Sequence, residues 1–284
     1  MSIRVNVNGV ITPPGEAKVS VLDHGLLFGD SVYETLRTYH GKPFLFSRHF
    51  ARLKHSAEGI QLRLPWTKEE TLEQVRRTLG PGECRIRLVI TRGAGELSAD
   101  AETCTDPTPI IIVVPLIAPS ETFYQEGVEV VISRVRRSER FADIKSGSLI
   151  HQVLAFGEAK SKRAFEAILL TTGEKLSDGI TSNVYLVRDG TLLTPSHEAG
   201  IVEGITRHVV LELAAEIGIP VTQGLFGVGE IRKADEMFLT STTREVVPIA
   251  RVDGNPVGNG RPGPITMRLL EAYRGAIDRL SQED

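Results

Sequence analysis

Apolar residues in this chain gather in short runs of strand length that alternate with longer stretches of helical periodicity. β-Branched or alternating apolar residues fill positions 84–91 and 110–115, which is typical of strands. Ser47 is a plausible N-cap for one helix, and Thr67 begins a second helix that ends near residues 80–82. Because neither kind of element dominates, the sequence predicts an α+β or mixed α/β fold.

The remaining elements follow from the same two periodicities. Residues 1–12 alternate like a strand, and strands at 32–39 and 43–46 flank a hairpin turn. The second half of the chain predicts a strand at 128–135, a helix at 148–163, a strand at 167–171, a hairpin turning at 188–190, a helix at 205–217, strands at 236–240 and 246–252, and a helix at 265–280.

The length of 284 residues favours two domains over one. A short polar segment, residues 118–122, follows a strand of buried type and is a plausible linker. We therefore expect an N-terminal α/β domain over residues 1–118, a linker over 119–124 and a C-terminal α/β domain over 125–284.

Charge and composition narrow the classes of partner. A net charge of −3 offers no broad basic field for nucleic acid or an anionic membrane, so small molecules are the expected partners. Cys84 and Cys104 belong to no CxxC pair and build no disulfide framework or metal site. Neither a signal peptide nor an apolar run of about 18 residues is found, which predicts a cytoplasmic protein without a membrane anchor.

Lys145 lies at the start of an apolar helix and is followed by small residues. Schiff-base chemistry needs a lysine in a confined place where burial or neighbouring cations lower its pKa, and small neighbours leave room for a flat ring. A lysine that starts a helix and points to water is the alternative.

Other residues could hold a phosphate group. Arg52 lies near the apolar stripe of the first helix and can turn inward to a phosphate or outward to water. Gly204, with Ile205 and Thr206, opens a helix whose free N–H groups can bind an anion. Residues 240–243 carry four consecutive hydroxyl groups, which can bind phosphate or cap a turn.

Asp178 precedes a strand and is a candidate partner for a protonated ring nitrogen, although it could also form an ordinary Asp-Gly turn. Together, a lysine, a carboxylate, an arginine, a helix-start glycine and a run of hydroxyls are the groups that a phosphate-bearing aldehyde cofactor requires.

Five blocks in this order resemble the class IV aminotransferases, which include branched-chain aminotransferases, D-amino acid aminotransferases and aminodeoxychorismate lyases. The blocks are residues 23–37 with 49–53, then 143–146, 178–184, 204–207 and 240–245. The resemblance implies a two-domain fold type IV homodimer with pyridoxal 5'-phosphate between the domains, acting on amino acids and 2-oxo acids.

The resemblance also implies roles for single residues. Lys145 is implied as the Schiff-base and proton-transfer residue, and Asp178 stands where the family usually has Glu. The other cofactor-binding residues implied are Arg52, Val202, Gly204, Ile205, Thr206, Ser241, Thr242 and Thr243. Arg87 shares a strand face with Arg85. It lies where branched-chain enzymes bind a carboxylate, and the alternative is a strand arginine that faces solvent. Phe28 and Tyr33 either line the apolar part of the pocket or belong to the core.

The expected reaction is transamination between an L-amino acid of branched-chain type and 2-oxoglutarate. Thr35 and Ile150 depart from the usual glycine and tyrosine of branched-chain enzymes, and Leu97 and Ala99 replace the basic pair of D-specific enzymes. Aminodeoxychorismate lyase, a D-amino acid or mixed-specificity transaminase and a non-catalytic binding protein are the alternatives.

Overall fold

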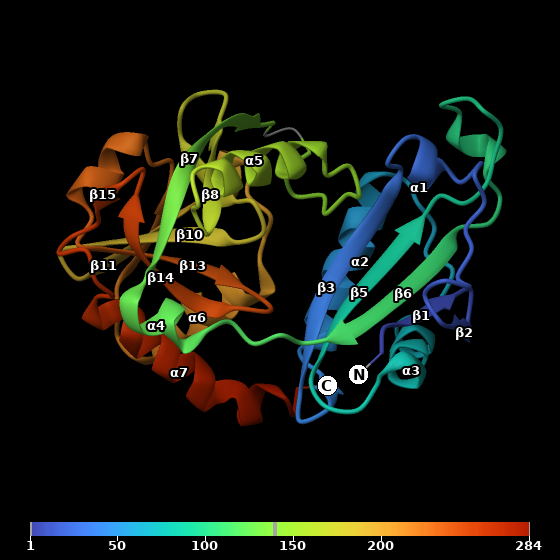
Figure 1. Ribbon diagram of the computed structural model, residues 1–284, viewed down its shortest axis with the longest axis horizontal. Helices are drawn as coiled ribbons and strands as arrows, with labels where there is room; N and C mark the ends of the chain where they lie inside the picture. Colours follow the sequence, from blue (N-terminus) through green and yellow to red (C-terminus); the bar gives the residue numbers. More distant parts are fainter. Residues whose placement is uncertain (1, 139–140, 284) are drawn as a thin grey trace. The chain divides into compact units, whose positions relative to one another are not determined.

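The computed structural model describes residues 2–138 and 141–283, and they form two compact units (Figure 1). Unit 1 contains Met1–Ile117, Ile144–Leu149 and Asp278–Asp284, and unit 2 contains Ala118–Asp143 and Ile150–Ile277. The sequence predicted one division of the chain, at a single linker. In the structure, two segments from later in the chain, Ile144–Leu149 and Asp278–Asp284, also belong to unit 1. One of these segments carries Lys145.

Unit 1 is built on a six-stranded antiparallel sheet in the order β2-β1-β6-β5-β3-β4. Its strands are β1 (Arg4–Val7), β2 (Val10–Thr12), β3 (Ser31–Tyr39), β4 (Lys42–Pro43), β5 (Cys84–Thr91) and β6 (Thr108–Pro115). The helices are α1 (His24–Leu27), α2 (Phe46–Gly59) and α3 (Lys68–Thr78), with the short η1 (Ala101–Thr103) before β6.

One face of this sheet packs against α2 and α3. Val32, Ile86 and Leu88 alternate inward and meet Leu53 of α2 and Val75 of α3 in one buried cluster. Since side chains alternate along a strand, the neighbouring residues of β3 and β5 lie on the opposite face.

The starts of helices α2 and α3 have different causes. Thr67 begins α3, as the sequence predicted, and it forms a capping box with Glu70. The prediction that Ser47 caps α2 is wrong, because the N-cap is Leu45 in the left-handed region and Phe46 is already helical. Leu45 and Phe46 are both buried, so burial rather than a polar cap determines where α2 begins. The strand predicted at 43–46 is correspondingly reduced to β4.

Unit 2 is built on a nine-stranded sheet in the order β12-β11-β10-β13-β14-β7-β8-β9, with β15 paired to β14. The strands are β7 (Val128–Arg137), β8 (Glu166–Thr171), β9 (Leu176–Gly179), β10 (Asn183–Arg188), β11 (Thr191–Pro195), β12 (Val221–Gly224), β13 (Glu236–Ser241), β14 (Glu245–Val252) and β15 (Asn255–Pro256). Because β9 also pairs with β10, the path from β10 through β13, β14, β7 and β8 to β9 closes on itself, and the closing pair is Asp178 opposite Asn183.

The helices of unit 2 are α4 (Glu121–Glu126), α5 (Ile150–Ser161), α6 (Ile205–Glu216) and α7 (Pro264–Leu280), whose end from Asp278 belongs to unit 1, with the short η2 (His197–Ala199) and η3 (Val228–Lys233). Helix α5 packs on β7 and β8, and α6 packs on β13. The α+β class is confirmed. Across the described residues, none of the helices has the length and apolar character that a membrane crossing requires.

Candidate functional site

Backbone contacts within unit 1 hold Lys145 in place. Its N–H donates to Ser56 Oγ on α2 at 3.0 Å, and its carbonyl accepts from Tyr33 N on β3 at 3.0 Å. Two residues further on, Gly147 N donates to Ser31 O at 2.7 Å, and a Cβ at Gly147 would lie 2.0 Å from Ser31 Oγ. The small residues after the lysine therefore permit a close approach of two backbones.

The side chain of Lys145 lies beside two of the predicted substrate residues. Its Nζ is 4.6 Å from the centroid of the Tyr33 ring, and the guanidinium carbon of Arg87 is 3.4 Å from the same centroid. Burial alone would raise the pKa of the Tyr33 phenol, but the cations of Lys145 and Arg87 together lower it. Among the described residues, no carboxylate pairs with Lys145 Nζ.

Phe28 has different neighbours in the structure. It follows α1, packs edge to face on His24 at 4.9 Å between ring centroids, and is 46% exposed. It is therefore not a core residue, and no contact in unit 1 places it beside Lys145.

Arg52 forms part of a buried network that sequence reasoning missed. Its Nε and Nη2 donate to the two oxygens of Glu34 at 2.7 Å each, and His49 Nδ1 donates to Glu34 Oε2 at 2.7 Å. Burial would raise the pKa of Glu34, but Arg52 and His49 hold it well below its ordinary value. Burial lowers the pKa of His49, although the neighbouring Glu34 carboxylate acts in the opposite direction.

A signal for this network was present in the sequence. Glu34 occupies an inward position between Val32 and Leu36, and a carboxylate on the apolar face of a strand needs cationic or N–H partners. His49 and Arg52 lie three residues apart on α2, so they share a helix face.

Asp178 lies in unit 2, at the position where the sheet closes. Its Oδ1 accepts from Asn183 Nδ2 and its Oδ2 accepts from Val202 N, both at 2.7 Å. Burial raises the pKa of Asp178 to about 6, although Arg137 and these two hydrogen bonds oppose the rise. A buried carboxyl group of this kind is suited to a cationic N–H partner, which is the chemistry of a protonated pyridine nitrogen.

Helix α6 begins beside this carboxylate with no side-chain cap. Its N-cap is Gly204. A Cβ added at this position would lie 2.0 Å from Asn183 Oδ1. The φ of Gly204 is −67°, so glycine is needed here for close approach and not for a left-handed backbone. The first-turn N–H groups of Ile205 and Thr206 are suited to a phosphate.

The hydroxyl run at the end of β13 divides into two parts. Ser241 Oγ accepts from Arg244 Nε at 3.0 Å, and Arg244 also donates to Thr181 Oγ1 at 2.6 Å and pairs with Glu166 at 2.8 Å. Thr242 and Thr243 have no such partner within the described chain, which leaves their hydroxyls for an anion. Arg244, which sequence reasoning did not assign, anchors this turn.

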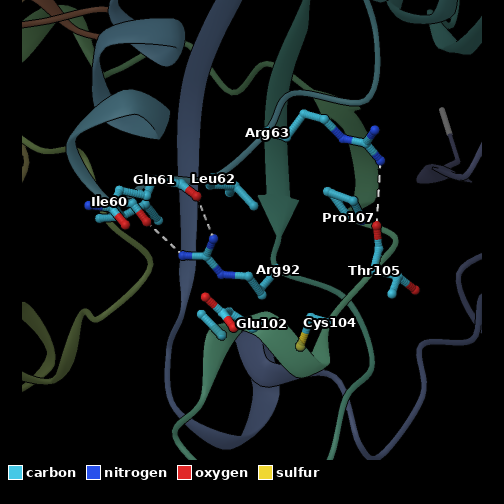
Figure 2. Close-up of a pocket in the computed structure, with 10 residues that line it drawn as sticks. Ile60, Gln61, Leu62, Arg63, Arg92, Glu102, Cys104, Thr105 and Pro107 are labelled. Atoms are coloured by element: carbon cyan, nitrogen blue, oxygen red, sulfur yellow. Dashed lines mark hydrogen bonds between the residues drawn. The ribbon is translucent and has the colours of Figure 1, made fainter.

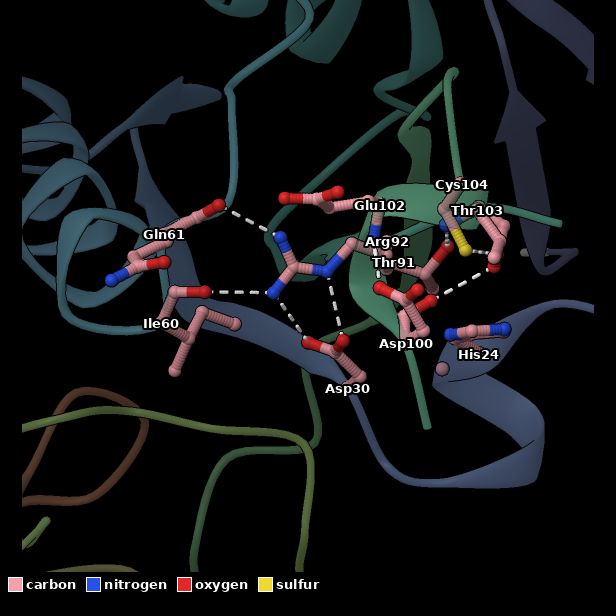
Figure 3. A network of polar contacts seen from close by, with 12 residues as sticks. His24, Asp30, Ile60, Gln61, Thr91, Arg92, Asp100, Glu102, Thr103 and Cys104 are labelled. Carbon is pink, nitrogen blue, oxygen red and sulfur yellow. Dashed lines mark hydrogen bonds and ion pairs between the residues drawn. The ribbon is translucent and has the colours of Figure 1, made fainter. Parts of the chain in front are cut away.

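Unit 1 also contains a cavity of about 300 Å³ between the segment after α2 and the segment around η1 (Figure 2). Beside it, Arg92 donates to both oxygens of Asp30 and to the carbonyls of Ile60 and Gln61 (Figure 3). None of the predicted site residues lines this cavity. Because Arg92 already has four acceptors, its structural role is to tie β3 and β5 to the end of α2.

The predicted site residues therefore fall into two sets. Unit 1 brings together Lys145, Tyr33 and Arg87, with Arg52 on the neighbouring helix. Unit 2 brings together Asp178, Val202, Gly204, Ile205 and Thr206 around the closing pair of its sheet. The donor set has the chemistry that pyridoxal phosphate requires: an amine, a buried carboxyl group and uncapped N–H groups.

Comparison with known proteins gives a consistent result. The family described as amino-transferase class IV matches residues 31–252. A Methanocaldococcus jannaschii protein assigned as a branched-chain-amino-acid aminotransferase is 36% identical, over 96% of both chains. The D-alanine aminotransferase of Listeria monocytogenes (strain 10403S) is 35% identical, over 99% of this chain and 98% of its own.

Solved structures show the same similarity. A branched-chain amino acid aminotransferase from T.th. superposes with a TM-score of 0.91 at 30% identity, over 99% of this chain and 95% of its own. That enzyme has been crystallised with pyridoxamine 5'-phosphate and with N-(5'-phosphopyridoxyl)-L-glutamate.

Proposed function

This chain belongs to the class IV aminotransferases, and from that premise we propose that it moves an amino group between an L-amino acid of branched-chain type and 2-oxoglutarate, with pyridoxal 5'-phosphate as its cofactor. The observation that carries the proposal is the position of Lys145, whose backbone is fixed on β3 and α2 while its amine lies over the Tyr33 ring.

Lys145 is the residue that binds the cofactor covalently and moves the proton at the substrate α-carbon. When bound, pyridoxal phosphate supplies an aldehyde and an electron sink. The Tyr33 ring lies against the amine, with 4.6 Å between Nζ and the ring centroid.

The residues of unit 2 are proposed to hold the ring and the phosphate. Asp178 keeps a proton on the ring nitrogen, supported by Asn183 and by the Val202 backbone. The N–H groups of Ile205 and Thr206 bind phosphate oxygens, and Gly204 allows the approach. Thr242 and Thr243 add hydroxyl donors, whereas Ser241 acts through the turn that Arg244 holds.

Arg52 is proposed as the phosphate contact from unit 1, and Arg87 as the group that binds the substrate carboxylate. A guanidinium binds carboxylate and phosphate with two parallel hydrogen bonds. Arg87 is already oriented by the Tyr33 ring and by Thr35 Oγ1, to which its Nη1 donates at 3.3 Å.

Covalent labelling tests the role of Lys145. Borohydride treatment of the purified protein should fix the cofactor to the peptide containing Lys145, and Lys145→Ala should abolish the fixation. Lys54→Ala, at an exposed position on α2, is the control and should label normally. Labelling that persists in Lys145→Ala would refute the assignment.

A D-amino acid donor is the second candidate, because D-alanine aminotransferases match the chain over nearly its whole length. A panel of L- and D-amino acids, followed by the loss of the cofactor's visible band in a single turnover, separates the two. Pyruvate release from aminodeoxychorismate without an amino acceptor would instead support a lyase.

We also propose that the chain acts as a homodimer. Four large apolar side chains of α5 are more than half exposed, namely Ile150, Val153, Leu154 and Phe156, and a patch of this kind is typical of an interaction surface. Light scattering should give twice the mass of 31.1 kDa, and Leu154→Glu should shift the protein towards the monomer.

A further inference from the structure

The turn between β13 and β14 carries Thr242 and Thr243, two of the residues proposed to bind the phosphate. It is a three-residue hairpin loop, in which Ser241 pairs with Glu245 across the strands and Arg244 N donates to Ser241 O at 3.2 Å. Loops of this length are followed by a residue in the left-handed region, where glycine is usual. Here that residue is Glu245, with a φ of +59°. Its backbone conformation therefore needs support from the surrounding structure.

Contacts from several elements of unit 2 give that support. Glu245 is buried and accepts from Arg274 Nε on α7 at 2.8 Å. The carbonyl of Arg244 accepts from the Tyr124 hydroxyl on α4 at 3.1 Å. The Arg244 side chain extends to strand β8 and to the loop between β9 and β10. The turn is thus fixed through its backbone and through the side chain of Arg244.

The Arg244 guanidinium is fully engaged by protein oxygens. Its Nε donates to Ser241 Oγ at 3.0 Å, its Nη2 donates to Thr181 Oγ1 at 2.6 Å, and its Nη1 is 2.8 Å from Glu166 Oε2. The side chain also lies over the Phe165 ring, 5.1 Å from the centroid. A guanidinium with all three nitrogens engaged in this way orients the turn instead of binding the phosphate itself.

Glu166 on β8 connects this turn to a second segment. Its side chain is 3% exposed, and its Oε1 accepts from Thr181 N at 2.7 Å and from Ser182 Oγ at 2.9 Å. Its Oε2 has no aligned hydrogen-bond donor among the described residues, so this buried oxygen depends on the ion pair with Arg244. One carboxylate therefore contacts both the β9–β10 loop and the β13–β14 turn.

These two segments carry the two ends of the proposed cofactor site. The β9–β10 loop lies between Asp178, proposed for the ring nitrogen, and Asn183, its partner in the closing pair. The β13–β14 turn carries the hydroxyl donors proposed for the phosphate. The ring nitrogen and the phosphate belong to one small molecule built on a rigid ring, so their separation varies little. The protein must hold both groups of ligands at a matching separation.

We propose that Glu166 and Arg244 are positioning residues for the cofactor phosphate. Their ion pair holds the turn of Thr242 and Thr243 at a fixed place relative to the loop that follows Asp178. The inference rests on the proposed binding of pyridoxal 5'-phosphate and adds two residues that act through the turn. Their contribution is therefore to the affinity for the phosphate group and not to the affinity for the ring.

The test uses pyridoxal, which has the aldehyde and the ring nitrogen but no phosphate. The purified full-length chain, freed of cofactor, is titrated with pyridoxal 5'-phosphate and with pyridoxal, and binding is followed by the visible band. Glu166→Gln keeps an oxygen for Thr181 and Ser182 but removes the charge opposite Arg244. It should weaken binding of pyridoxal 5'-phosphate about tenfold, as expected for one charge-assisted contact, and should leave pyridoxal within twofold.

Variants of Arg244 separate position from charge. Arg244→Gln and Arg244→Lys should both weaken pyridoxal 5'-phosphate about tenfold, because neither side chain can engage three acceptors at once. The double variant Glu166→Gln/Arg244→Gln should bind no more weakly than either single variant, since the two residues act as one pair. Glu174→Gln is the matched control. It removes an exposed ion pair with Arg136 in the same unit and should change neither affinity.

Four results would overturn the proposal. They are an equal loss of affinity for both ligands, an unchanged affinity for both, full recovery in Arg244→Lys, and losses that add in the double variant. The proposed function fails differently. Wild-type protein that fixes no cofactor to Lys145 on reduction would refute that function. Normal fixation, together with unchanged affinities in the variants, would refute only the positioning role.

Discussion

Glu34 and Arg52 form a bidentate ion pair, with both hydrogen bonds 2.7 Å long, around a carboxylate that is 1% exposed. Strand β3 and helix α2 therefore fix the plane of the guanidinium proposed to contact the phosphate. His49 completes the set of donors to Glu34. The packing of β3 against α2 therefore orients the Arg52 guanidinium, which is the candidate group for binding the phosphate.

Replacing the carboxylate should be costly. We expect Glu34→Gln to lower the free energy of unfolding by about 3 kcal/mol, because breaking a buried ion pair leaves a charge without compensation. Urea unfolding at pH 7 measures this. Glu73→Gln, at an exposed position on α3, should change stability by less than about 0.5 kcal/mol, and an equal effect of both changes would contradict the assigned role.

The same pair predicts a dependence of stability on pH. In the folded protein the pKa of Glu34 is held well below the ordinary value of 4.5. The stabilisation is therefore complete above pH 4.5 and is lost as the pH falls from 4.5 towards the folded-state pKa. The difference in stability between wild type and Glu34→Gln should therefore be full at pH 7 and clearly smaller at pH 3. A difference that persists undiminished in acid would disprove the ionic origin.

For Asp178 we expect the opposite dependence of stability on pH. Its pKa is raised from 3.8 to about 6, so protein freed of cofactor should be stabilised fully below pH 4 and should lose up to about 3 kcal/mol as the pH rises to 6. Asp178→Asn should lack this loss over the same range. Unfolding curves at pH 4, 5 and 6 measure the slope, and parallel slopes would refute the prediction.

A substitution at Gly204 tests how closely the start of α6 approaches Asn183, which pairs with Asp178 where the sheet closes. We expect Gly204→Ala to cost about 1–3 kcal/mol through overpacking against Asn183, and to weaken cofactor retention. Gly275→Ala is the matched control, since a Cβ there meets nothing within 4 Å and alanine favours a helix by about 0.5–1 kcal/mol. Thermal unfolding should move the two variants in opposite directions.

A substitution at Tyr33 tests the surroundings of the Lys145 amine. Tyr33→Phe keeps the ring under Arg87 but removes the hydroxyl, whose pKa Lys145 lowers. We expect kcat/KM to fall about tenfold, the size of one polar interaction with a charged group, with the melting temperature nearly unchanged. A large fall in melting temperature with normal kcat/KM would instead assign Tyr33 to the core.

Several elements follow from local sequence because their causes are local. The side chains of Thr67 and Glu70 each accept a hydrogen bond from the other residue's backbone N–H within a single turn. The start of α3 was therefore predictable. Asp189 and Gly190 both adopt positive φ in the turn between β10 and β11, as the predicted hairpin requires. The start of α2 was not predictable, because Leu45 takes a left-handed conformation only to bury its side chain.

The sequence by itself determined the α+β class, the positions of the longer strands and helices, and the family, because periodicity, turn residues and short motifs are properties of neighbouring residues. Only the tertiary structure decided that Ile144–Leu149 returns to β3, that Glu34 holds Arg52, and that Asp178 closes a sheet against Asn183. Each of these depends on how two elements pack and on which buried polar groups need partners. Such requirements exist only once the chain has folded.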